Sequence, residues 1–125
     1  MMRILVLSPF GAKEPFGLEN LKKVARADTE VVHEDISKIY PLKYLSPLYY
    51  RYKTIDGTVD RVIKAEHEGY DAVAISCMYD PGLLECRDVV SIPVTGALES
   101  STHIASMMGY SYSILTVLPL VNYAW

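Results

Sequence analysis

The stretch Asp71-Ala72-Val73-Ala74-Ile75-Ser76 decides the fold, because it is the clearest buried strand in the sequence. Its central side chains are small or β-branched and lack the polar alternation of a strand that faces water on one side. A second apolar run, Arg3 to Leu7, ends at the turn-forming residues Ser8-Pro9-Phe10-Gly11. Strands buried on both faces are typical of parallel sheets that helices cover on both sides.

Helical patterns alternate with these strands. Apolar spacing with one buried face predicts helices from Phe16 to Ala27 and from about Thr58 to Gly69. A third helix is expected to open at Asp80-Pro81, with the aspartate as N-cap and the proline in the first turn. A fourth is predicted from Glu99 to Met108, with Gly109 as its C-terminal cap. The remaining strands are predicted at 30–33, 92–95 and 111–117.

This alternation predicts the α/β class. Right-handed crossovers then give a flavodoxin-like, doubly wound parallel sheet in the strand order 2-1-3-4-5. We expect one domain over residues 1–117, followed by an apolar C-terminal tail over 118–125. A chain of 125 residues is large enough to bury a core without metals or disulfides.

Composition narrows the range of partners. The formal net charge is -3 and no basic run occurs, which argues against nucleic acid and against a membrane surface as partners. The N-terminal apolar run is too short for a signal peptide or a membrane span, so a cytoplasmic protein with free thiols is expected. The three histidines are scattered, so no metal site is predicted.

Tyrosines crowd the segment from Ile39 to Lys53, together with Pro41 and Pro47. Tyrosine offers a large contact area with a polar tip, so the segment could be a lid over a site or a contact surface. An irregular loop packed on the core is the alternative.

In a doubly wound sheet, ligands bind beyond the carboxyl ends of the strands. The residues that follow the predicted strands are rich in hydroxyl groups and small side chains and include one thiol. This set suits a small-molecule substrate with a carboxylate or an imide. The candidate substrate-binding residues are Ser8, Pro9, Phe10, Met78, Gly96, Glu99, Ser100, Ser101, Thr102 and Thr116.

Cys77 is the candidate catalytic residue. It follows a strand and precedes the expected helix start at Asp80, whose positive end would favour the thiolate. A thiolate with a near-neutral pKa can remove a proton from carbon, and the thiol can return one. The alternative is a buried cysteine that packs as a small hydrophobe. Cys86 shares a helical face with Leu83 and Val90, so it is assigned to the core.

Three segments resemble the aspartate/glutamate/hydantoin racemase family, and hydantoin racemases in particular. Residues 74–83 (AISCMYDPGL) are similar to the family's first-cysteine segment. Residues 92–105 (IPVTGALESSTHIA) resemble its second segment, and 109–116 (GYSYSILT) the strand that follows. All three occur in the family's order with family-like spacing.

The resemblance implies one half of a two-domain, pseudosymmetric racemase fold that works without a cofactor. A cysteine from each domain acts on one face of the substrate's α-carbon, and Cys77 matches the first of these. Ser100 to Thr102, with Thr116, would hold the carboxylate or imide oxygens of the substrate. The family's first turn usually reads Asn-Pro-Asn where this chain has Ser8-Pro9-Phe10, so contacts from that turn are expected to differ.

The family's second domain and second cysteine have no counterpart in these 125 residues. We therefore expect this N-terminal half to be inactive alone and to need a homo-oligomeric partner or a chain that supplies the second domain. The alternatives are a non-catalytic binding or assembly module, a partner-dependent subunit, and maleate isomerase-like activity in a full-length parent.

Overall fold

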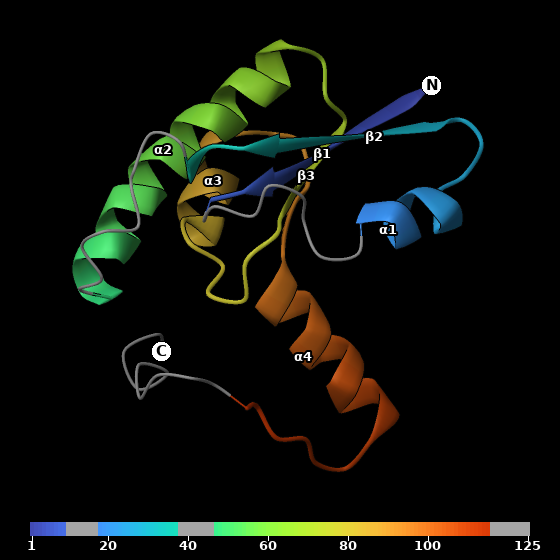
Figure 1. Cartoon of the computed structure of the whole chain (residues 1–125), viewed down its shortest axis with the longest axis vertical. Helices are drawn as coiled ribbons and strands as arrows, with labels where there is room; N and C mark the ends of the chain where they lie inside the picture. The colour runs from blue at the N-terminus through green and yellow to red at the C-terminus, as the bar shows by residue number, and fades with distance from the viewer. Residues whose placement is uncertain (10–17, 38–46, 116–125) are drawn as a thin grey trace.

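A four-stranded parallel sheet organises the chain in the computed structural model, which describes residues 1–9, 18–37 and 47–115. The strands are β1 (Met2–Ser8), β2 (Thr29–Asp35), β3 (Ala72–Ile75) and β4 (Val94–Gly96). They lie in the order β2-β1-β3-β4 (Figure 1). In the central register Leu5 pairs with Val73, and Val73 pairs with Val94. The predicted parallel α/β fold is confirmed, as is the order of its first four strands.

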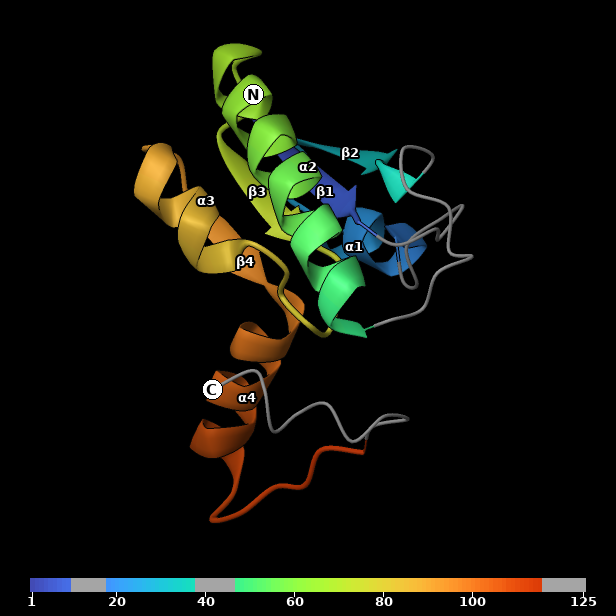
Figure 2. The same cartoon turned by 90° about the vertical axis from the view of Figure 1, so that its left-hand side faces the viewer.

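The described residues form four helices: α1 (Leu18–Val24), α2 (Pro47–His67), α3 (Leu83–Val89) and α4 (Ala97–Met108). α2 and α3 lie side by side against the sheet (Figures 1 and 2). α1 contacts mainly β2 and buries none of its residues, so the buried face predicted for this helix is wrong. No helix in the described ranges is long and apolar enough to cross a membrane.

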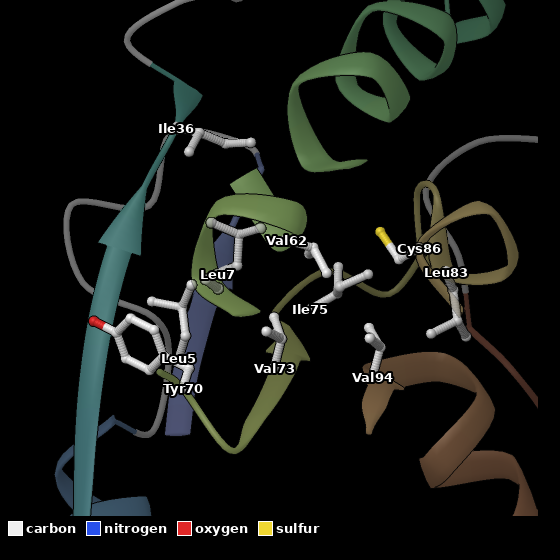
Figure 3. Packing of buried hydrophobic residues seen from close by; sticks show 11 residues of the cluster. Leu5, Leu7, Ile36, Val62, Tyr70, Val73, Ile75, Leu83, Cys86 and Val94 are labelled. Atoms are coloured by element: carbon white, nitrogen blue, oxygen red, sulfur yellow. The ribbon is translucent and has the colours of Figure 1, made fainter. Parts of the chain in front are cut away.

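The core forms where α2 and α3 meet the centre of the sheet. Figure 3 shows the converging side chains of β1, β3, α2, α3 and β4, among them Leu5, Leu7, Val73, Ile75, Val62, Leu83, Cys86 and Val94. Full burial of such an apolar side chain contributes about 1.5–3 kcal/mol. Cys86 is 0% exposed, which confirms its assignment to the core.

α2 begins at Pro47, well before the predicted Thr58, so residues 47–53 of the tyrosine-rich segment are helical and not an irregular loop. Proline is well suited to the first helical position, where no hydrogen bond is lost. The helix stops before Gly69, as predicted, and the left-handed φ of 78° at this glycine allows the chain to turn. Residues 38–46 lie outside the described residues, so the lid and the contact surface stay predictions.

The predicted fifth strand is not formed by residues 111–115, and residues 116 and 117 lie outside the described residues. α4 leads the chain away from the sheet (Figures 1 and 2), and Leu115 is 100% exposed. A strand forms only against a neighbouring edge, and this segment does not return to the edge at β4. Gly109 does act as the predicted C-cap of α4, since its N–H donates to the Ala105 carbonyl at 3.1 Å.

Candidate active site

Cys77 lies in the loop that joins the carboxyl end of β3 to α3, as predicted. The strand ends at Ile75, and the N–H of Ser76 donates to the Leu7 carbonyl on β1 at 2.8 Å. The chain then turns, and the N–H of Asp80 donates to the Cys77 carbonyl at 3.0 Å. Cys77 is half-buried and packs against the hydrophobic core. Its thiol is therefore held at the sheet edge where α/β proteins bind ligands.

Burial raises the pKa of the Cys77 thiol from its ordinary value of 9.0 to about 11. The negative charge of Asp80 adds to this rise in pKa, whereas a hydrogen bond from the Tyr79 N–H opposes it. The predicted thiolate with a near-neutral pKa is therefore wrong. α3 begins only at Leu83, and the influence that lowers the pKa comes from the loop and not from that helix.

Iodoacetamide should label Cys77 faster than Cys86 at neutral pH. Both thiols are protonated there, since burial raises the pKa of Cys86 to about 12, so access decides the rates. Cys77 is half-buried whereas Cys86 is fully buried. Because the thiolate is the nucleophile, labelling of Cys77 should rise about tenfold per pH unit below its pKa. Mass mapping after limited alkylation measures both rates, and equal labelling at pH 7 would contradict this picture.

Asp80 reaches a different helix from the one expected. Its Oδ1 accepts the N–H of Leu98 at 3.0 Å, and its Oδ2 accepts the N–H of Glu99 at 2.7 Å. These are N–H groups that the first turn of a helix leaves without intrahelical partners, so Asp80 caps α4 from a distance. The prediction that Asp80 caps α3 is wrong, because the N-cap of α3 is Gly82 and no side chain caps it.

Gly96, a candidate binding residue, makes room for that carboxylate. A Cβ at this position would lie 2.5 and 2.6 Å from the two carboxylate oxygens of Asp80. The φ of Gly96 is -109°, which other residues also adopt, so the close approach and not the backbone conformation demands glycine here.

Glu99, another candidate binding residue, forms a salt bridge with Arg87. Arg87 donates to both of its carboxylate oxygens, at 3.0 and 2.6 Å, and donates through Nε to the Val94 carbonyl at 2.9 Å. The Arg87 hydrogen bond lowers the pKa of Glu99 below its usual value. The structure therefore gives this candidate binding residue a charged partner of its own on α3.

The three hydroxyl candidates lie in the first half of α4. Ser101 donates to the Ala97 carbonyl at 2.6 Å, and Thr102 donates to the carbonyls of Leu98 and Glu99 at 3.0 and 2.9 Å. Their hydrogens are directed at their own helix, so these two hydroxyls can meet a ligand as acceptors. Ser100 is half-buried in the same stretch.

The first-turn candidates lie deeper than expected. Ser8 is 1% exposed, and its hydroxyl lies 3.0 Å from Nε2 of His33 on β2. Pro9 is also buried, whereas Met78 beside Cys77 is exposed. Phe10 and Thr116 lie outside the described residues. Among the residues that the structure describes, no three His, Cys, Asp or Glu side chains are grouped to hold a metal ion.

Two residues of this site, Asp80 and Arg87, were not among the candidates. A sequence signal for the first exists, since the helix at Ala97 follows glycine and has no local Ser, Thr, Asp or Asn as N-cap. The free N–H groups at such a helix start can be satisfied by a remote side chain, by water or by a ligand. Arg87 gives no such signal, because its contacts depend on how α3 packs against β4 and α4.

Comparisons with known proteins agree with this architecture. The profile of the family described as Asp/Glu/Hydantoin racemase matches residues 48–122. A hydantoin racemase from Pseudomonas sp. (strain NS671) is 40% identical over 107 residues, which are 85% of this chain and 42% of the relative. A hydantoin racemase from Rhizobium meliloti is 32% identical over 66 residues, 53% of this chain and 27% of the relative.

Among solved structures, allantoin racemase from Klebsiella pneumoniae matches with a TM-score of 0.84 at 26% sequence identity. The match covers 99% of this chain and 51% of that chain. The chain thus spans about half the length of this structure and less than half of the Pseudomonas relative.

Proposed function

Because this chain belongs to the Asp/Glu/hydantoin racemase family, we propose that it supplies one of two thiols that move a proton at the α-carbon of a hydantoin-like ring. The observation that carries the proposal is the position of Cys77. Its thiol lies at the carboxyl end of β3, half-buried, on a loop bound to the first turn of α4. The relatives named as hydantoin racemases support the substrate class.

The raised pKa of Cys77, about 11, suits this proton transfer in both directions. At neutral pH the thiol form dominates, so the group is ready to deliver a proton to a carbanion. Its rare thiolate is a stronger base than that of an ordinary cysteine, which helps in removing a proton from carbon. The reaction moves protons only, and side chains alone can carry it.

The second thiol of the pair has to come from outside these residues. The chain contains two cysteines, and Cys86 is 0% exposed within the core. A group in that position cannot reach the opposite face of a substrate held beside Cys77. We therefore propose that a second domain, and not a second copy of these 125 residues, supplies the second acid.

A neutral ring suits the site better than an acidic amino acid. Asp80 already occupies the N–H groups of Leu98 and Glu99. A substrate carboxylate placed there would meet the negative charge of Asp80 and find both donors taken.

Protection of Cys77 from alkylation tests this function and its substrate class. An excess of a 5-substituted hydantoin should slow iodoacetamide labelling of Cys77 several-fold, whereas glutamate at the same concentration should not. Labelling of Cys86 serves as the internal control. Protection by glutamate alone, or none by the hydantoin, would contradict the proposal.

Exposed apolar side chains favour assembly as a second candidate function. Ile104, Met107 and Met108 of α4 are 56%, 86% and 83% exposed, and Leu115 follows them. Apolar groups gathered in this way mark contact surfaces in soluble proteins. We propose that a second copy of the chain covers this α4 surface.

Sedimentation at micromolar concentration should therefore show a dimer. Replacing Met107 and Met108 together by glutamate should shift the chain to monomer, because charge in an apolar interface opposes association. Leu84→Glu is the matched control, since Leu84 is 71% exposed but lies on α3. A clean monomer of the unaltered chain would refute the proposal.

A further inference from the structure

We infer that Asp80 is a positioning residue for the Cys77 thiol, because its carboxylate fastens the Cys77 loop to the first turn of α4. The inference rests on the function proposed above, in which Cys77 is the reacting group. Figure 1 shows the loop between β3 and α3 reaching the start of α4. Ser100, a candidate binding residue, follows in that first turn, so the clamp sets where it lies relative to the thiol.

Both oxygens of Asp80 are used in this clamp. Each accepts one N–H of α4, at 3.0 Å from Leu98 and 2.7 Å from Glu99. Hydrogen bonds from backbone N–H groups to a carboxylate are charge-assisted and shorter than those between neutral groups. A carboxylate at the N terminus of α4 also lies at the favourable end of the helix dipole.

The backbone of Asp80 ties the clamp to two further elements. Its N–H donates to the Cys77 carbonyl at 3.0 Å, and its own carbonyl accepts the N–H of Leu83 at the start of α3 at 3.2 Å. Its φ is 43°, a left-handed conformation that few residues other than glycine, asparagine and aspartate adopt readily. Asp80 thus connects the Cys77 loop to both α3 and α4.

The clamp places a negative charge near the thiol. Among the residues that the structure describes, Asp80 is the charged group that acts on Cys77, and its charge raises the thiol pKa beyond the effect of burial. Arg87 of α3 and Glu99 of α4 are paired at 2.6 Å and largely offset each other, and the other charged side chains of α3, Glu85 and Asp88, are exposed to solvent. Removing the Asp80 charge should therefore favour the thiolate.

The test is the pH–rate profile of Cys77 alkylation by iodoacetamide in three variants of the 125-residue chain. Asp80→Asn keeps the size and the left-handed backbone but removes the charge and one acceptor. Asp80→Gly keeps the backbone conformation and removes the clamp entirely. Asp88→Asn, on the exposed side of α3, removes the same charge without touching the loop.

We expect Asp80→Asn to label Cys77 several-fold faster at pH 8, with its profile displaced to lower pH, while Asp88→Asn follows the wild type. In Asp80→Gly, hydrogen exchange at the Leu98 and Glu99 amides should accelerate about tenfold or more, because both lose their acceptor. Wild-type profiles and wild-type exchange in both Asp80 variants would overturn the inference. The labelling needs no substrate, so it can contradict this inference without contradicting the proposed function, and the reverse is also true.

Discussion

Replacing Gly96 with alanine should destabilise the fold by about 2–3 kcal/mol, a large effect for one added methyl group. The new Cβ would lie 2.5 and 2.6 Å from the carboxylate oxygens of Asp80, which real structures do not tolerate. Asp80 would have to move and give up its hydrogen bonds to Leu98 and Glu99, so the overpacking and the lost cap of α4 act together. Urea unfolding measures the loss.

Gly109→Ala is the matched control for that substitution. The nearest atom to a Cβ at Gly109 is the Ser111 carbonyl oxygen at 3.6 Å, an ordinary contact, and the φ of -153° suits alanine. Its effect on the free energy of unfolding should stay within about 0.5 kcal/mol. A double-mutant cycle sharpens the comparison. In an Asp80→Gly background, Gly96→Ala should cost little, giving a coupling energy of about 2 kcal/mol, whereas full additivity would show that Asp80 is not the obstacle.

The isolated chain should leave the optical rotation of an enantiopure 5-substituted hydantoin unchanged beyond the rate of a protein-free blank. Two-base racemisation needs an acid on the face opposite the base, and loss of one acid or base group typically lowers the rate about 10²–10⁴-fold. Cys86, fully buried in α3, cannot supply it. Polarimetry follows the rotation. A loss of rotation that disappears in Cys77→Ala would show that this chain is a competent racemase by itself.

Much of the fold could be predicted because its signals are local. The run from Asp71 to Ser76 has the composition of a strand buried on both faces. In the structure, β3 occupies the four central residues of that run. Cys77 then falls at the carboxyl end of that strand by chain order alone. The face shared by Cys86 and Leu83 likewise predicted a core position, and both residues are buried.

The wrong predictions concern features that depend on residues distant in sequence. Residues 111–115 have strand-like composition, but a strand needs an edge, and α4 carries this segment away from β4. Asp80 precedes a proline in a motif typical of a helix start, yet its carboxylate pairs with Leu98, 18 residues along the chain. The missing local cap at Ala97 is a sequence signal, but it does not show which distant side chain supplies the acceptor.

The prediction for the pKa of Cys77 was also wrong, because that pKa depends on tertiary packing. The start of a helix can be predicted from the local sequence, whereas the burial of Cys77 against the core depends on how its loop packs in the folded protein. Desolvation disfavours the thiolate more than the Tyr79 N–H favours it. The sequence therefore indicated that Cys77, and not Cys86, could react. It did not indicate that the Cys77 thiol is protonated at neutral pH.

Deuterium incorporation at the α-carbon tests most directly whether Cys77 is an acid/base group. One enantiomer of a 5-substituted hydantoin is incubated in heavy water with the wild type, with Cys77→Ala or with Cys86→Ala, and each is corrected for a protein-free blank. A single working thiolate removes the proton, exchanges it for deuterium with the solvent, and returns deuterium to the same face of the carbanion. We expect deuterium to enter with the wild type and with Cys86→Ala, at a rate that rises toward the Cys77 pKa of about 11, while optical rotation is retained. Incorporation that is unchanged in Cys77→Ala, or none above the blank with the wild type, would contradict the assignment of Cys77 as the base.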